Sequence, residues 1–288
     1  MKVSIGLPST IPGVDCAEVV AWARQADDGP FHSLAVLDRI VFDNLESLVT
    51  LAVVAGVTHR IRLMTTVLLA PTRPAGLLAK QAASIDRFSR GRLTLGLGIG
   101  SRPDDYVAAT ATWSNRGRRL EQELETMAAI WSGKRSQPDL GPIGPEPVQF
   151  GGPEILLGGS DPRAIARVGR WGHGYISGGG GSPDAVINLY QAASRAWSAA
   201  GRSGRPRLVA CVYFAIGEEN RSMAEGYLRT YYGSANPYAQ SIIGRLVTSP
   251  QAVAEALERY AQAGADELVF WPCVAQRDQL ERLAQAVS

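Results

Sequence analysis

The sequence predicts a (β/α)8 barrel, an α/β fold in which eight parallel strands alternate with helices around a closed cylinder. Eight short apolar segments alternate with helix-like segments along the chain. Each connection between consecutive strands is long enough for a right-handed parallel crossover. The length of 288 residues fits a single barrel domain over residues 1–288, since such barrels need about 250 residues. An open doubly wound sheet is the alternative, and eight parallel strands favour closure at this length.

The first half of the chain carries clear signals for helix ends. Asp15, with Glu18 three residues later, is typical of a helix N-terminus. Gly56 ends the second helix, and Pro74 and Gly91 bracket the third. The predicted strands are 3–7, 33–37, 61–68 and 93–97, and the predicted helices are 15–28, 45–55 and 75–88.

The second half continues the alternation, with two interruptions. Residues 132–153 and 233–248 are rich in glycine, proline and polar residues, and we predict both as irregular insertions. A long polar connection, 98–115, precedes the fourth helix. The predicted strands are 154–157, 175–177, 208–216 and 267–271, and the predicted helices are 116–131, 163–171, 183–200, 224–232, 250–263 and 276–287.

The composition excludes several classes of protein. Hydrophobic residues make up 45% of the chain and charged residues 19%, values typical of a soluble folded domain. A net charge of +2 without a basic stripe argues against nucleic-acid binding, and no apolar run is long enough to span a membrane. Cys16, Cys211 and Cys273 are too few and too far apart for a disulfide framework, so we expect a cytoplasmic protein.

A glycine-rich run follows the fifth predicted strand, at the barrel end where active sites lie. It reads Gly158-Gly159-Ser160-Asp161-Pro162-Arg163 and leads into a helix. Unpaired amides at a helix N-terminus bind anions, so the run predicts a phosphate site. The alternative is an ordinary helix start in which Asp161 is the N-cap and Pro162 the first helical residue.

A second glycine pattern, Gly96 to Gly100, follows the fourth strand. It does not predict a dinucleotide fingerprint, because no helix begins at these glycines. His32, His59 and His173 all precede strands and so lie at the opposite end of the barrel from the site. The sequence therefore lacks the ligands for a catalytic metal and the histidine for a serine triad, which favours a bound cofactor.

Asp38 is the one carboxylate that directly follows an apolar strand at the catalytic end. We predict it as a catalytic residue, with an N-cap or a pair with Arg39 as the alternative. Further along, Arg119 stands at a helix start, where a positive charge opposes the helix dipole. Glu123 lies four residues later, the spacing at which opposite charges pair on a helix.

Several segments, in this order and spacing, resemble the bacterial luciferase-like flavin-dependent oxidoreductases, a family that includes coenzyme F420-dependent reductases and dehydrogenases. The matching segments are 33–39, 61–101, 116–131, 158–164 and 249–272.

The resemblance implies a barrel that binds FMN or F420 at the carboxyl ends of its strands, commonly as a homodimer. It implies a cis peptide bond between Thr66 and Val67, behind the cofactor ring, and places Asp38 beside the ring or the substrate. The implied contacts to the ring are Thr65, Thr66, Val67 and Leu68, and those to the side chain and phosphate are Gly98, Gly100, Ser101, Gly158, Gly159, Ser160 and Arg163.

Arg39 departs from the family pattern, in which a histidine often follows the acid of the second strand. A peroxyflavin needs proton management, so this change favours F420-dependent hydride transfer to or from a small organic substrate. The alternatives are an FMN-dependent monooxygenase, a non-catalytic flavin-binding protein, and a barrel enzyme that acts on phosphorylated metabolites.

Overall fold

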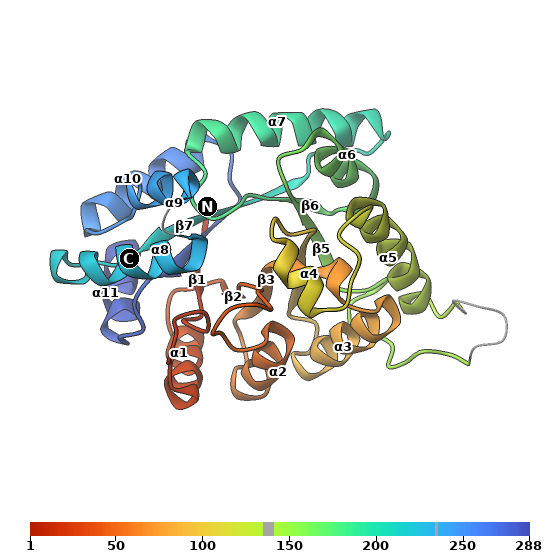
Figure 1. Ribbon diagram of the computed structural model, residues 1–288, viewed down its shortest axis with the longest axis horizontal. Coiled ribbons are helices and arrows are strands. Elements are labelled where there is room, and N and C mark those ends of the chain that lie inside the picture. Colours follow the sequence, from red (N-terminus) through yellow and green to blue (C-terminus); the bar gives the residue numbers. More distant parts are fainter. Residues whose placement is uncertain (135–140, 234–235) are drawn as a thin grey trace.

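The computed structural model describes residues 1–134, 141–233 and 236–288 and shows a closed barrel of eight parallel strands. Each strand pairs with the next in the sequence, and β8 closes the barrel on β1. Helices surround the strands (Figure 1). The predicted fold class is confirmed.

The strands lie close to their predicted positions. They are β1 (Lys2–Gly6), β2 (Ser33–Val36), β3 (Arg62–Leu69), β4 (Leu93–Gly98), β5 (Glu154–Gly158), β6 (Gly174–Ile176), β7 (Arg207–Phe214) and β8 (Glu267–Pro272).

The longer helices were all predicted, and two short ones were not. The helices are α1 (Cys16–Asp28), α2 (Ser47–Val57), α3 (Ala75–Phe88), α4 (Pro103–Ala108), α5 (Arg116–Trp131), α6 (Pro162–Trp171), α7 (Pro183–Ala199), α8 (Arg221–Tyr232), α9 (Pro237–Ile243), α10 (Pro250–Gln262) and α11 (Asp278–Val287), with short 3-10 helices η1 (Ala70–Thr72) and η2 (Glu218–Asn220).

One prediction of irregular structure needs correction. The segment 233–248 contains α9, so it is not irregular throughout, and the polar connection 98–115 contains the short helix α4. In the segment 132–153, residues 132–134 and 141–153 form no helix or strand, and 135–140 lie outside the described residues. The buried carboxylate of Asp86 on α3 accepts hydrogen bonds from the backbone amides of Val148 and Gln149, which fixes the end of this segment against the barrel.

The apolar interior has two parts, because side chains alternate along each strand. Leu34 and Val36 belong to an outer core between the strands and the helices, whereas Ala35 belongs to an inner core inside the barrel. Tyr227 and Ile242, from α8 and α9, also belong to the inner core. These two helices therefore pack over the barrel interior and help to enclose its carboxyl end.

A charged network fills the opposite, amino-terminal end of the barrel. The guanidinium of Arg207 bonds to the carboxylates of both Glu154 and Glu267, and Glu267 is completely buried. Glu267 also accepts a hydrogen bond from Ser4 Oγ. Among the described residues, no helix is both long enough and apolar enough to cross a bilayer.

Candidate functional site

A cavity opens at the carboxyl ends of the strands, the barrel end at which the sequence predicts the site. It has two adjoining lobes of 710 and 510 Å³, here named the large lobe and the small lobe. The lobes share lining residues from the ends of β3, β4 and β6, so they form one continuous site. The shared residues are Thr66, Val67, Gly100, Ser101, Gly178, Asn236 and Tyr238.

The structure brings most of the predicted cofactor contacts together and places three of them elsewhere. Thr65 is fully buried and its hydroxyl donates to the carbonyl of Gly96 at 2.7 Å, within the barrel wall. Leu68 packs into the outer core, because the register shift between Thr65 and Leu68 turns it away from the cavity. Arg163 is exposed on α6 and does not line either lobe. The predicted contacts that line the large lobe are Thr66, Val67, Gly98, Gly100, Ser101, Gly158, Gly159 and Ser160.

The end of β3 forms a shelf inside the cavity. The peptide bond between Thr66 and Val67 is cis, which confirms what the resemblance implies, and the pairing of β3 with β4 shifts register here. Val67 lines both lobes. A Cβ atom on Gly98 would lie 2.7 Å from Cγ2 of Val67, and one on Gly158 would lie 3.3 Å from Cγ1. Glycine at position 98 therefore makes room for Val67, and glycine at position 158 avoids a tight contact with it.

Asp38 is held on all sides, which argues against the catalytic role predicted for it. Its Oδ1 accepts hydrogen bonds from Ser47 Oγ at 2.9 Å and Arg73 Nη2 at 3.0 Å. Its Oδ2 accepts from the amide of Leu69 at 2.8 Å and Arg73 Nη1 at 2.7 Å. A carboxylate has about four acceptor sites, so these donors occupy its whole capacity. Asp38 anchors the chain just after β3 and leaves no lone pair for a substrate.

Arg39 is also held by its neighbours. Its Nε lies 3.3 Å from a carboxylate oxygen of Asp105 on α4, and its Nη2 donates to the carbonyl of Val41 at 2.8 Å. Its Nη1 donates to the carbonyl of Tyr231, at the end of α8, and Arg102 donates to the same carbonyl. Two positive charges at a helix C-terminus stabilise the helix dipole. Arg39 therefore joins α4 and α8 beside the small lobe.

The glycine run after β5 has features of both a helix start and an anion site, the two interpretations that the sequence allows. Asp161 accepts a hydrogen bond from the amide of Arg163 at 2.8 Å, so it is the N-cap of α6. Its carboxylate disfavours a second anion at that amide. The amides of Gly159 and Ser160 face no acceptor within the described part of the chain, and both residues line the large lobe. These two amides are the anion donors that the run offers.

Arg167 is a site residue that the sequence did not reveal. It lies on α6, lines the large lobe and is buried, with its Nε 2.9 Å from a carboxylate oxygen of Glu121. A Cβ atom on Gly117 would lie 2.4 Å from Nη2 of Arg167, so glycine on α5 makes room for this guanidinium. The sequence does carry a hint of this role, since Arg167 stands one turn after Arg163 on the same helix. The family resemblance, however, points to Arg163 for the phosphate.

Tyrosines from the end of α8 and the start of α9 form one wall of the small lobe. Tyr231, Tyr232 and Tyr238 line it, and their rings meet edge to face. The hydroxyl of Tyr232 lies 2.7 Å from that of Tyr213, and Tyr238 donates to the carbonyl of Gly179 at 2.9 Å. Burial raises the pKa of Tyr232 well above its ordinary value. The wall therefore carries neutral phenols across the physiological pH range.

The chemistry of the site is that of a binding cavity with hydrogen-bond donors. The three histidines precede β2, β3 and β6, at the other end of the barrel, as predicted. Within residues 1–134, 141–233 and 236–288, no cluster of three or more His, Cys, Asp or Glu side chains has the arrangement of a metal site. Donors, glycines and apolar surface suit a bound cofactor that carries the reaction.

A closed (β/α)8 barrel with a glycine-lined cavity at the carboxyl ends of its strands defines a ligand-binding barrel protein. The family model for luciferase-like monooxygenases matches residues 1–245. The chain belongs to this luciferase-like family of flavin- and F420-dependent oxidoreductases.

Individual proteins are also similar to this chain. An uncharacterized protein of Mycobacterium tuberculosis (strain ATCC 25618 / H37Rv) is 32% identical over 199 residues, which cover 65% of this chain and 68% of that protein. An F420-dependent secondary alcohol dehydrogenase, solved with an F420-acetone adduct, has a TM-score of 0.80 at 14% identity and covers 100% of both chains. A type II Baeyer-Villiger monooxygenase of Pseudomonas putida, solved with FMN, has a TM-score of 0.76 at 17% identity and covers 99% of this chain and 95% of that chain. At these identities the two solved structures show the shared fold.

Proposed function

We propose that this chain is an F420-dependent oxidoreductase that transfers a hydride between the deazaflavin and a small organic substrate. The observation that carries the proposal is the small lobe, where Asp38 and Arg39 are each paired with an oppositely charged protein side chain. Beside the Val67 shelf the lobe therefore offers neutral phenols and the guanidinium of Arg102, and among the described residues that line it there is no unpaired carboxylate and no histidine. Hydride exchange with a deazaflavin needs less acid–base equipment than oxygen activation does.

The residues present fit such a cofactor. The Val67 shelf, with Gly98 and Gly158 on either side, provides apolar surface for a flat ring. The amides of Gly159 and Ser160, together with Arg167, provide donors for its phosphate. When bound, the cofactor supplies the ring that accepts or donates the hydride.

The remaining residues position the shelf and the substrate. We assign Asp38 as a positioning residue, because its carboxylate ties Leu69 to Arg73 directly after β3. Tyr232 and Tyr238 keep their protons, but Tyr238 already donates its proton to Gly179 and Tyr232 shares a hydrogen bond with Tyr213, so this wall positions a substrate mainly through its aromatic surface. The apolar wall of the large lobe excludes water from the ring.

Cofactor titration tests the proposal. The purified chain is titrated with F420 and, separately, with FMN, while the fluorescence of the cofactor is followed. Arg167→Gln should weaken binding about tenfold or more, since it removes a charged donor from the cavity. Arg163→Gln is the matched control on the same helix and should bind as the wild type does. Loss of binding in the Arg163 variant alone, or no binding of either cofactor to the wild type, would contradict the proposal.

Turnover separates the alternatives. The holo-protein is assayed with small alcohols and ketones and with F420 or its reduced form. Tight FMN binding with substrate-dependent oxygen consumption would favour an FMN-dependent monooxygenase. Cofactor binding without turnover under any of these conditions would favour a non-catalytic flavin-binding protein.

We further propose a homodimer in which α2 contacts a second copy. The outward face of this helix consists of Val49, Ala52, Val53 and Gly56, all apolar and exposed. A helix that is apolar all round is typical of one that is buried in an assembly. Sedimentation analysis should show a dimer that Val53→Glu dissociates, whereas Val107→Glu, at an exposed position on α4, leaves it intact. A monomeric wild type at micromolar concentration would refute this assignment.

We also infer one catalytic domain and a reducing compartment. The barrel uses strands from Lys2 to Pro272, which supports a single domain over 1–288. Cys16, Cys211 and Cys273 are free thiols, and this supports a cytoplasmic location.

A further inference from the structure

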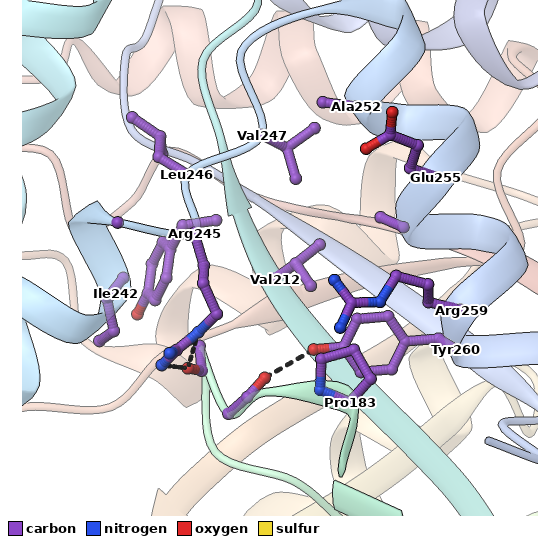
Figure 2. A pocket seen from close by; sticks show the side chains of 15 residues that line it. Pro183, Val212, Ile242, Arg245, Leu246, Val247, Ala252, Glu255, Arg259 and Tyr260 are labelled. Atoms are coloured by element: carbon purple, nitrogen blue, oxygen red, sulfur yellow. Dashed lines mark hydrogen bonds between the residues drawn. The ribbon is translucent and has the colours of Figure 1, made fainter. Parts of the chain in front are cut away.

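A second cavity, here named the outer pocket, lies outside the barrel wall between β7 and α10 (Figure 2). Its volume is 240 Å³. Val212 of β7, with Ile242 and Val247, gives it an apolar floor and side, and Tyr260 of α10 closes one edge. Of the residues that the structure describes, only Gly181 lines both this pocket and the large lobe. The outer pocket is therefore a separate space that adjoins the site through a shared segment.

Two arginines enter the outer pocket without a carboxylate partner among the described residues. Arg245 donates through Nε to the carbonyl of Gly180 at 3.1 Å and through Nη2 to Ser241 Oγ at 2.7 Å, whereas the guanidinium of Arg259 bonds to no described residue. Figure 2 shows Arg259 directed into the pocket beside Tyr260, with the carboxylate of Glu255 turned towards Ala252. Glu255 stands one turn before Arg259 on α10 and makes no ion pair with it. The pocket thus presents two exposed guanidinium groups that no described carboxylate pairs with, together with the carboxylate of Glu255, over an apolar floor.

The wall between the outer pocket and the site is a run of four glycines, 178–181. Its carbonyls are held from the outside, since Arg245 bonds to that of Gly180 and Tyr260 Oη donates to that of Gly181 at 2.6 Å. Gly178 lines both lobes of the site on the other side. A change in the position of Arg245 therefore reaches the backbone that borders the cavity.

We propose that the outer pocket binds a small organic anion, with its carboxylate or phosphate on Arg245 and Arg259 and its apolar part against Val212. An ionised acceptor forms a stronger bond to a guanidinium than a neutral carbonyl does. A bound anion consequently draws Arg245 away from Gly180 and loosens the glycine wall. Ligand in the outer pocket then changes the affinity of the site for its cofactor.

The binding half of the proposal is tested by calorimetry with phenyl phosphate and with benzoate. The chain carries Arg167→Gln in every arm, so that the large lobe contributes no phosphate site of its own. We expect saturable binding of at least one probe, weakened about tenfold by Arg259→Gln and unchanged by Arg195→Gln, an exposed arginine on α7. Inorganic phosphate and acetate, tested alone, separate the charged group from the apolar body. No saturable binding, or equal affinity in the Arg259 variant, overturns the proposal.

The coupling half is tested on the wild-type chain with its cofactor. The dissociation constant of F420 or FMN is measured with and without a saturating concentration of the better probe. We expect a shift of about threefold or more that Arg259→Gln abolishes. An unchanged constant, or a shift that survives in the Arg259 variant, overturns the coupling. Probe binding is measured without cofactor, so its result does not depend on whether the proposed oxidoreductase activity is correct.

Discussion

Replacement of Glu123 by glutamine should stabilise the folded chain, and increasingly so as the pH rises. Glu123 lies on α5, is 5% exposed, and its Oε2 has no hydrogen-bond partner among the described residues. Arg119 stands four residues earlier, but its Nη1 donates to the carbonyl of Pro71 at 2.9 Å, and no ion pair with Glu123 forms. The pairing that the helical spacing predicts is therefore absent.

Burial raises the pKa of Glu123 from 4.5 to about 8, although the positive charge of Arg119 acts in the opposite direction. Between these two pH values the unfolded chain has released a proton that the folded chain keeps. The contribution of Glu123 to stability is therefore present in full below pH 4.5, falls as the pH rises and is lost by about pH 8. Each pH unit in this window corresponds to about 1.4 kcal/mol, so the advantage of the glutamine variant should grow by about 2 kcal/mol from pH 6 to pH 8.

Chemical denaturation of wild type and variant at a series of pH values measures this difference directly. The readout is the free energy of unfolding of Glu123→Gln minus that of the wild type, because the other titrating groups then cancel. Glu125→Gln, at an exposed position two residues along α5, is the matched control and should show a flat difference. A flat difference for Glu123→Gln as well, or a loss of stability that grows with pH, would refute the reasoning.

Two further substitutions test the frame of the site. Gly98→Ala should displace Val67 and weaken cofactor binding about tenfold in the fluorescence titration, because the new Cβ would lie 2.7 Å from Val67 Cγ2. Gly226→Ala is the control: this residue of α8 has open space around it, so the substitution should leave the affinity unchanged. Asp38→Asn should lower the free energy of unfolding by about 3 kcal/mol in a urea titration, since it leaves the buried guanidinium of Arg73 short of its main partner. If the free energy of unfolding falls by less than about 1 kcal/mol, the positioning role is refuted and Asp38 is again a candidate catalytic residue.

The barrel could be predicted because its signals are local. The helix over residues 75–88 has its predicted ends, since Pro74 starts it, apolar residues recur on one face and glycine follows shortly after its end. Helix α9 escaped prediction because seven residues give too few turns to show a period, and the glycines and proline around it suggest a loop.

The site was less predictable, because its contacts join residues that are distant in the sequence. Arg167 becomes a cavity residue only when α5 supplies a glycine opposite it, and spacing within α6 does not report that. Leu68 fell on the wrong side of β3 because the register shift at Val67 decides which residues of this strand face the cavity.

The pair Asp38 and Arg39 shows why residue type alone did not assign the roles. Adjacent residues in an extended segment point in opposite directions, so the two charges do not neutralise each other. Asp38 instead pairs with Arg73, 35 residues away, and Arg39 pairs with Asp105 on α4. Arg73 lies outside the small lobe, whereas Asp105 lines it beside Arg39, so the charges of Asp38 and Arg39 are both paired at the edge of the lobe. A histidine in place of Arg39 would leave the buried Asp105 without its ion-pair partner and would release the contact to α8. The arginine at position 39 therefore comes with its own contacts, to Asp105 on α4 and to the end of α8. It affects how the small lobe is packed as well as which chemical groups the lobe offers.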